Sequence, residues 1–385
     1  MKRTVYSAEH EAFRDTVRTF IAKEISPYFA EWERDGKAPR DLFTRLAAIG
    51  ATGFDIPEEF GGTGPTSYKF QAIMVEEAAR AGVGFGHHTV SVGIVVPYLL
   101  RLANAEQRRR WFPGIAAGET MLCIAMTEPG TGSDLAGIRT TAALSDDGTH
   151  YVLNGSKTFI TGALNSELCV VVARTSPAPD NNRRFGLSLL VVPTDADGFT
   201  YGRKLEKIGL RAQDTSELSF TDVRVPVENM LGEQDHCFSY LGQNLPRERL
   251  AIAVGAVAMA TAAIGHAQAY VQERQIFGQT VAHFQNTKFV LAECSAEVEA
   301  AQAFVDRGLD LDDAGELTPA DAARVKLFAT EVADRVIDKC LQLHGGYGYM
   351  LEYPIARLYA DTRVQRIYGG TSEVMKTIIA KDMGL

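Results

Sequence analysis

The chain has 385 residues, which is enough for two or three domains of ordinary size. Its composition, 46% hydrophobic and 23% charged, is that of a soluble globular protein, and a net charge of −9 argues against a nucleic-acid or anionic membrane partner. The five cysteines are odd in number and form no C-x-x-C pair, which excludes a disulfide framework or a metal site of that type. Met1–Phe20 is charged throughout, so we expect no signal peptide and a cytoplasmic location.

The first third of the chain carries apolar residues at the spacing of amphipathic helices. The run Gly61-Gly62-Thr63-Gly64-Pro65 interrupts this pattern and indicates a break between helices. We predict helices in the ranges 8–33, 41–50, 68–81 and 88–103, and a shorter one in 104–118.

From about Cys123 the apolar runs become short, β-branched and separated by turn residues. The sequence Ser145-Asp146-Asp147-Gly148 is typical of a hairpin turn. Strands without helices between them favour a small antiparallel barrel or sandwich and disfavour a doubly wound nucleotide-binding fold. The expected strands include Tyr151–Leu153, Leu168–Ala173, Leu187–Val192 and Glu217–Phe220.

Helical periodicity returns at about Glu233 and lasts to the end of the chain. Pro246 interrupts the first of these helices, and Thr318-Pro319 has the composition of a helix start. The charge-free stretch Leu250–Gly265 is shorter than the about 20 residues that span a bilayer, so we expect a buried helix and no membrane insertion. The acidic run Asp310–Glu316 is expected to be a solvated loop. The predicted domains are 1–122 (helical), 123–232 (β) and 233–385 (helical).

Three stretches have residues that suit a ligand. The loop Met126–Asp134 combines glycines and hydroxyls that can bind a phosphate or a ring edge, although alone it is better explained as a structural turn. In Lys157–Thr161, Phe159 can stack on a ligand ring, although a core position explains it as well. Arg274 matches phosphate geometry, while the glycines after both C-terminal helices can be simple helix caps.

Together these stretches resemble the acyl-CoA dehydrogenases over essentially the full length of the chain. The blocks that carry the resemblance are Thr127–Asp134 (TEPGTGSD), Gly209–Thr215 (GLRAQDT), Arg274–Gly278 (RQIFG), Gln342–Gly346 (QLHGG) and Tyr368–Glu373 (YGGTSE). The resemblance implies a mainly α fold with a β-barrel between an N-terminal helical domain and a C-terminal four-helix bundle. It also implies an FAD-dependent oxidoreductase of CH–CH bonds in fatty acid β-oxidation, a homotetramer, and an electron-transferring flavoprotein as electron acceptor.

The same resemblance assigns the binding residues. Arg274, Phe277, Gln342 and Gly346 match positions that reach the FAD of a neighbouring subunit. The full set expected at the cofactor is Met126, Thr127, Ser133, Phe159, Ile160, Thr161, Arg274, Phe277, Gln285, Gln342, Gly345, Gly346, Thr371 and Glu373. The residues expected at the substrate are Ser133, Arg249, Tyr368 and Gly370, and no metal is expected.

The catalytic base is displaced from its commonest position in the family. Many relatives carry a glutamate in a Tyr-Glu-Gly-Thr loop, but here Gly369 occupies that place. Either the protein is inactive or the carboxylate comes from elsewhere. The block Leu245–Leu250 (LPRERL) resembles the long-chain and isovaleryl types, which place the glutamate on a helix, so Glu248 is the expected base. The long-chain type is the better match, because Gly369-Gly370-Thr371 and Gln213-Asp214-Thr215 follow its pattern. Alone, a glutamate between arginines is more often a surface ion pair. The Gly369 amide is expected to polarise the thioester carbonyl.

Two other functions remain open from the sequence. A flavin oxidase on the same fold would pass electrons to oxygen, although acyl-CoA oxidases are usually longer chains. A non-catalytic acyl-CoA-binding protein would keep the fold without the chemistry. The acyl chain length is not defined, and we expect apolar residues within 70–105, with the glycines of 82–86, to form the pocket floor.

Overall fold

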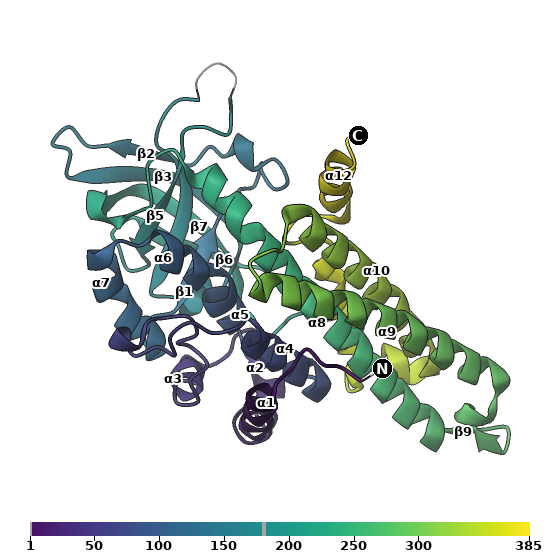
Figure 1. The fold of residues 1–385 in the computed structure, drawn as a ribbon. Coiled ribbons are helices and arrows are strands. Elements are labelled where there is room, and N and C mark those ends of the chain that lie inside the picture. The colour runs from purple at the N-terminus through teal and green to yellow at the C-terminus, as the bar shows by residue number, and fades with distance from the viewer. Residues whose placement is uncertain (1, 179–181) are drawn as a thin grey trace.

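A computed structural model describes residues 2–178 and 182–385. Met1 belongs to the segment in which we expect no signal peptide, and it lies outside the described residues. The large sheet occupies one end of the molecule and the long C-terminal helices the other, with a small hairpin at the far end of these helices (Figure 1). The N-terminal helices lie along both parts. The helix–strand–helix order expected from the sequence is therefore present.

The N-terminal helices agree with the predicted ranges, except that the range 8–33 is broken around Pro27. Two π-helical turns, Ile21–Ile25 and Ser91–Val95, interrupt the regular helices. The α-helices are α1 (Ala8–Phe20), α2 (Phe29–Asp35), α3 (Leu42–Ala47), α4 (Lys69–Ala81), α5 (His88–Val90), α6 (Val96–Leu102) and α7 (Ala105–Ala116).

The middle part forms one eight-stranded sheet in the order β6-β7-β3-β2-β4-β5-β8, with β1 paired to β4. The strands are β1 (Leu122–Ala125), β2 (Thr141–Leu144), β3 (His150–Thr161), β4 (Leu168–Arg174), β5 (Leu187–Pro193), β6 (Phe199–Lys204), β7 (Thr215–Pro226) and β8 (Met230–Leu231). The expected all-antiparallel arrangement is wrong at β4, which pairs in parallel with β1 and β2. The connection from β1 to β4 includes β2 and β3, so it has the length that a parallel pair requires.

Strand β4 is buried on both faces, and this explains its unbroken apolar sequence. Leu168, Val170 and Val172 pack with α6 and α7, whereas Cys169 and Val171 face the interior of the sheet domain. The β domain is therefore fixed firmly to the N-terminal helices, and the loops at its edge have a rigid base.

The C-terminal part contains α8 (Cys237–Glu273), α9 (Gln285–Asp313), α10 (Pro319–Leu343), α11 (Pro354–Thr362) and α12 (Ser372–Asp382), with a short hairpin of β9 (Gln275–Ile276) and β10 (Gln279–Thr280). Helix α8 continues through Pro246. It is long and apolar enough to cross a membrane, but 61% of its most apolar window is buried in the protein, as in a core helix. Thr318 caps α10, as expected.

The acidic run Asp310–Glu316 is not a simple solvated loop. Helix α9 extends to Asp313, and the side chains of Asp310 and Asp313 pair with Lys69 at 2.9 Å and 2.8 Å. Asp312 pairs with Arg247 of α8 at 3.2 Å. These contacts hold the end of α9 against α4 and α8, next to the cavity described below.

Candidate active site

Glu248 lies on α8 where this helix passes from the sheet domain into the helical bundle. Its side chain is buried, and the hydroxyl of Tyr98 on α6 donates a hydrogen bond of 2.9 Å to its Oε1. Burial raises the pKa of the Glu248 carboxyl to about 7, although the Tyr98 hydrogen bond and the charge of Arg249 oppose this rise. Glu248 is therefore not a surface ion pair but a carboxylate that gains and loses a proton near neutral pH.

A cavity of about 330 Å³ opens beside this carboxylate, between α6, α8 and the loop that joins α9 to α10. The side chain of Asn244, one turn before Glu248, is buried, and among the described residues its Nδ2 atom meets no hydrogen-bond acceptor in good geometry. The lining residues are Gly93, Ile94, Pro97, Arg101, Gln243, Asn244, Pro246, Arg247, Glu248, Asp312, Gly315 and Leu317.

The glycines expected at the pocket floor are not among these lining residues. A Cβ atom on Gly86 would lie 2.7 Å from Ala38, so this glycine allows the N-terminal helices to pack closely. The glycine on the cavity is Gly93 instead, where a Cβ would lie 3.0 Å from Oε1 of Gln71. The expectation that residues of 70–105 line the pocket holds for Gly93, Ile94, Pro97 and Arg101.

Two buried cations hold the loop that contains Gly369. Arg249 donates from Nε to the Gly369 carbonyl at 3.3 Å. Lys326 on α10 donates from Nζ to the carbonyls of Tyr368, at 2.6 Å, and of Gly370. Gly369 and Gly370 have φ angles of 63° and 95°, which favour glycine. The structure thus brings Glu248, Arg249 and the expected loop residues close to one another.

The loop Met126–Asp134 rests on a buried ion pair. Lys157 on β3 donates from Nζ to Oε1 of Glu128 at 2.9 Å and to the Met126 carbonyl at 3.0 Å. Glu128 also accepts from the backbone N–H of Thr140 and from its hydroxyl, which lowers the pKa of its carboxyl against the effect of burial. The loop is therefore fixed from below while Ser133 is exposed.

Phe159 projects from a β-bulge next to this loop. The register of β3 shifts between Lys157 and Ile160, and Phe159 has a φ of 61° and is 66% exposed. A large aromatic side chain in a left-handed conformation and in contact with water is costly unless something covers it. The alternative explanation, a core position for Phe159, is therefore wrong. The exposed ring suits stacking on a planar ligand ring. The Thr158 N–H donates to the Thr127 carbonyl at 2.9 Å, so the two segments are joined.

Six other expected cofactor residues lie at the opposite end of α8, whereas Thr371 caps α12 and Glu373 stands in its first turn. Arg274 and Phe277 follow this helix, and the Arg274 guanidinium lies 5.5 Å from the ring of Tyr347 beside the end of α10. Phe277 is 93% exposed. Glu273 is 25 residues beyond Glu248, which corresponds to about 38 Å along a helix. The other members of this distal group are Gln285, Gln342, Gly345 and Gly346, all exposed.

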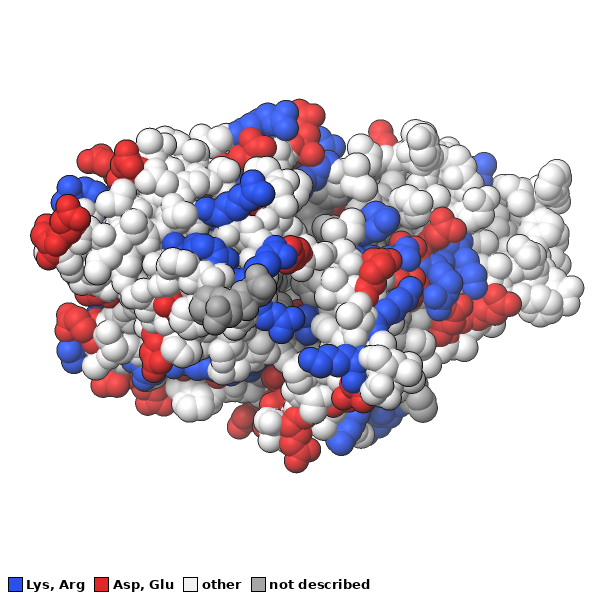
Figure 2. Space-filling view, turned by 90° about the horizontal axis from the view of Figure 1, so that it is seen from above, with Lys and Arg blue, Asp and Glu red and all other residues white. Residues whose placement is uncertain are grey.

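Charged side chains mark the surface between the two halves of the molecule. Seen from above, a hollow near the middle has Lys and Arg side chains around its rim (Figure 2). Asp and Glu side chains lie among them, so the rim carries both signs of charge (Figure 2).

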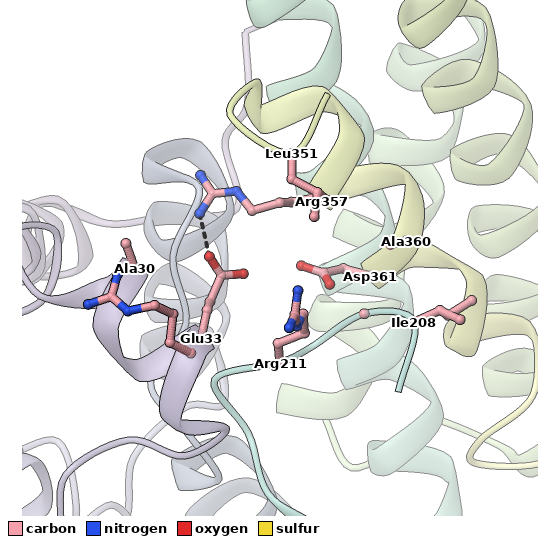
Figure 3. Close-up of a pocket in the computed structure, with 10 residues that line it drawn as sticks. Ala30, Glu33, Ile208, Arg211, Leu351, Arg357, Ala360 and Asp361 are labelled. Atoms are coloured by element: carbon pink, nitrogen blue, oxygen red, sulfur yellow. Dashed lines mark hydrogen bonds and ion pairs between the residues drawn. The ribbon is translucent and has the colours of Figure 1, made fainter. Parts of the chain in front are cut away.

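A second cavity, of about 150 Å³, is a junction between the three parts of the chain (Figure 3). There Arg357 of α11 pairs with Glu33 of α2 at 2.9 Å, and Asp361 accepts a hydrogen bond from the Leu210 N–H. Burial raises the pKa of the Asp361 carboxyl to about 6. A Cβ on Gly209 would overlap the backbone of Ala360, so the first residue of the GLRAQDT block allows close packing against α11.

Three models of the acyl-CoA dehydrogenase family match the chain: the N-terminal domain at residues 7–119, the middle domain at 123–223 and the C-terminal domain at 236–384. The chain belongs to the acyl-CoA dehydrogenase family. As a member of this family it is an oxidoreductase, and its fold is the acyl-CoA dehydrogenase fold expected from the sequence.

Among relatives, the long-chain specific mitochondrial acyl-CoA dehydrogenase of Sus scrofa is 44% identical and covers 99% of this chain and 88% of its own length. Acryloyl-CoA reductase (NADH) of Anaerotignum propionicum is 34% identical, with coverage of 100% and 97%. Among solved structures, acyl-CoA dehydrogenase from Geobacillus kaustophilus has a TM-score of 0.95, 41% identity and full coverage of both chains. An acyl-CoA dehydrogenase complexed with FAD from Bacillus anthracis has a TM-score of 0.91 and 31% identity, and covers 100% of this chain and 69% of that one.

Sequence reasoning missed three residues of the site. Tyr98 contacts Glu248 across 150 positions of the chain. Lys326 and Lys157 are buried lysines whose ammonium groups hold backbone carbonyls, and in the sequence each looks like an ordinary helix or strand residue. The available signal was the position of Lys157 near the middle of a strand, where a charged residue needs a partner.

Proposed function

We propose that the protein is an FAD-dependent acyl-CoA dehydrogenase that oxidises the Cα–Cβ bond of a fatty acyl-CoA, with Glu248 as the base that removes the α-proton. The observation that carries the proposal is the buried Glu248 carboxylate on the cavity wall, held by Tyr98 and able to ionise near pH 7. A base with this pKa combines sufficient basicity with a large ionised fraction at neutral pH.

The residues around the Met126–Asp134 loop suit an isoalloxazine ring. Phe159 offers an exposed aromatic face, and Gly130 and Gly132 leave open space where a side chain would stand. The likeness to a structure complexed with FAD supports the same assignment. FAD, when bound there, supplies the hydride acceptor for Cβ. Met126, Thr127, Ser133 and the Phe159–Thr161 segment would hold it from the β domain, and Thr371 and Glu373 from α12.

The chain divides the work at the substrate between α8 and the loop at 368–370. Glu248 takes the proton from Cα, and the Tyr98 hydroxyl on Oε1 leaves Oε2 for this task. Arg249 and Lys326 hold the loop carbonyls, and in the described part of the chain the N–H of Gly369 donates to no other group. This free N–H would polarise the thioester carbonyl as negative charge develops on its oxygen.

The distance between the two groups of cofactor residues supports a homo-oligomer, and we propose the tetramer typical of the family. One FAD molecule cannot lie at Phe159 and also touch Phe277 of the same chain if the distal group is about 38 Å from Glu248 along α8. A second copy could bring its Phe277 and Gln342 to this site. The exposed Phe277 side chain would then be covered by the cofactor or by the second copy.

The long-chain specific relative favours a fatty acyl thioester and a place in β-oxidation, with an electron-transferring flavoprotein as acceptor. The likeness to an acryloyl-CoA reductase keeps the reverse reaction as the second candidate. A cytoplasmic location stays a prediction.

Anaerobic mixing with saturated acyl-CoAs of graded length and branching tests the proposal, because bleaching of the flavin absorption reports oxidation of the substrate. We expect bleaching by a fatty acyl-CoA, and a rate lower by about 10²–10⁴-fold or more in Glu248→Gln, with FAD still bound. Glu106→Gln, an exposed ion-paired glutamate on α7, is the matched control. Wild-type protein that binds FAD but is bleached by no acyl-CoA would refute the proposed direction, and consumption of NADH with an enoyl-CoA would favour the reductase.

A further inference from the structure

Lys326 is a buried cation without an acidic partner. Its side chain is 1% exposed on α10, and within the described residues no carboxylate lies at ion-pair distance from Nζ. Burial and the nearby charge of Arg249 lower the pKa of the Lys326 ammonium to about 8. Burying a charge is unfavourable unless other groups replace its hydration, so the contacts that Lys326 makes have to be specific.

Those contacts are two carbonyls of one short loop. Nζ donates to the oxygens of Tyr368 and Gly370, and Arg249 donates to the oxygen of Gly369 between them. Three consecutive carbonyls are thus held by two cations on α10 and α8. The intervening backbone is left-handed at both glycines, so the loop would not keep this shape without such contacts.

The peptide group links these contacts to the amide. In a planar trans peptide the C=O of one residue and the N–H of the next point in opposite directions. A Tyr368 carbonyl directed at Lys326 therefore directs the Gly369 N–H away from Lys326. In the described chain the N–H groups of Gly369 and Gly370 have no hydrogen-bond partner, although both residues are only half-exposed. Unpaired backbone N–H groups in such places are rare and suggest a missing acceptor.

We propose that Lys326 is a positioning residue that aims the Gly369 N–H at the carbonyl oxygen of the acyl thioester. The inference rests on the proposed function. It concerns the second requirement of the reaction: beside the removal of the α-proton, the negative charge that develops on the thioester oxygen must be stabilised. Lys326 itself touches neither substrate nor cofactor. Its role differs from bracing alone because it fixes the direction of one hydrogen-bond donor.

The test compares Lys326→Met with wild type, both loaded with FAD. Met matches the four-atom aliphatic stem of the lysine and removes the ammonium group with all three donors. The first readout is the absorption band of a bound arylacryloyl-CoA, whose red shift reports polarisation of the thioester carbonyl. The second is the rate of anaerobic flavin reduction by a saturated acyl-CoA. Lys339→Met is the control, because Lys339 is a half-exposed lysine of the same helix α10 that pairs with Glu297.

We expect Lys326→Met to lose most of the red shift and to reduce its flavin about 10–100-fold more slowly, because a misdirected donor should cost less than the deletion of one. The dissociation constant of the acyl-CoA should change less than threefold, and Lys339→Met should behave as wild type. A Lys326→Met protein that keeps the full shift and rate overturns the role of Lys326 and leaves the proposed function intact. Wild-type protein that shows neither shift nor bleaching overturns the proposed function, and this inference with it.

If Lys326→Met does not retain FAD, the measurement moves to Lys326→Gln, whose side-chain amide can still donate to one carbonyl. A partial loss of the red shift supports the proposal, and an unchanged shift overturns it. The shift decides the matter because a purely structural role would lower the amount of loaded protein without changing the band of the ligand that does bind.

Discussion

Replacing Tyr98 by Phe removes a single hydroxyl from the site and tests what sets the basicity of Glu248. The ring, which is fully buried, can stay in place, while Oε1 loses its 2.9 Å hydrogen bond. A hydrogen bond to a charged group contributes about 1.5–3 kcal/mol. At about 1.4 kcal/mol per pKa unit, its loss should raise the pKa of the carboxyl from about 7 to roughly 8–9.

The consequence is a shift of the pH profile rather than a simple loss of activity. Glu248 reacts as the carboxylate, so activity is present above its pKa and falls as the pH drops through it. At pH 7 the ionised fraction would decrease from about one half to roughly 1–10%, so flavin reduction would slow by about 5–50-fold and recover at high pH. The other charged groups near Glu248 and on the cavity wall, Arg249, Arg101, Arg247 and Asp312, are unchanged in this variant.

Single-turnover flavin reduction between pH 6 and about 10 measures this profile. Tyr151→Phe removes a hydroxyl that bonds to Gln234 in the β domain and provides the matched control. An acid limb that stays at the wild-type pH in Tyr98→Phe would refute the assignment of this limb to Glu248 or the role of Tyr98. A lower rate at every pH, without a shift, would mean that Tyr98 orients the base but does not tune it.

Four further predictions rest on other contacts of the site. Burial raises the pKa of the Glu248 carboxyl from its ordinary 4.5 to about 7, so ionisation of the native carboxyl destabilises the fold as the pH rises between these two values. Glu248→Gln should therefore unfold at higher urea concentration than wild type at pH 8, by up to about 3 kcal/mol, and similarly to wild type at pH 4.5. The double variant Glu248→Gly with Gly369→Glu moves the carboxylate to the loop, and we expect it not to restore flavin reduction. A Cβ at position 369 would overlap Cδ1 of Ile252, and the backbone there has a left-handed φ. Adding Ile252→Ala removes the overlap and should give more activity than the double variant shows. Phe277→Ala should release FAD from the oligomer faster than wild type does, without changing the pH profile of the enzyme that remains loaded. The fluorescence of free flavin measures the release, and equal rates in Phe277→Ala and wild type would argue against a shared site. Lys157→Met should destabilise the fold by about 3–5 kcal/mol in urea unfolding, because it leaves Glu128 buried and unpaired; a loss below about 1 kcal/mol would contradict this.

Local patterns in the sequence predicted the long elements well. The helices of 68–81 and 88–103 and the strands β4 and β5 are apolar over most of their length, so their burial fixes their type. The strands β1, β2 and β6 were missed because each is only four to six residues long. The parallel pairing of β1 with β4 depends on the whole sheet, and no local pattern reveals it.

The site was predicted unevenly for a related reason. Glu248 was selected as the expected base because the resemblance showed which residue was missing from the loop, and the structure places its carboxyl beside a cavity. Tyr98 was not, since its contact with Glu248 joins two helices far apart in the chain. The run Asp310–Glu316 was misjudged because an acidic run on its own is usually solvated, whereas here the folded chain brings Lys69 and Arg247 to it.

The absence of a side chain at position 369 of the loop agrees with the position of Ile252 on α8. This residue lies one turn after Glu248 on α8, and its Cδ1 fills the space where a Cβ of residue 369 would stand. Helix α8 thus carries both Glu248, the proposed base, and the side chain that stands beside position 369. Without a side chain at 369, the loop can lie close to α8, where Arg249 reaches its carbonyl, while Lys326 holds it from α10. In the proposed reaction the two tasks would lie on different parts of the chain: proton removal on a rigid helix, and donation to the thioester carbonyl on a loop fixed by two cations. A change on α8 that enlarges the space at Ile252 should loosen the loop before it affects Glu248.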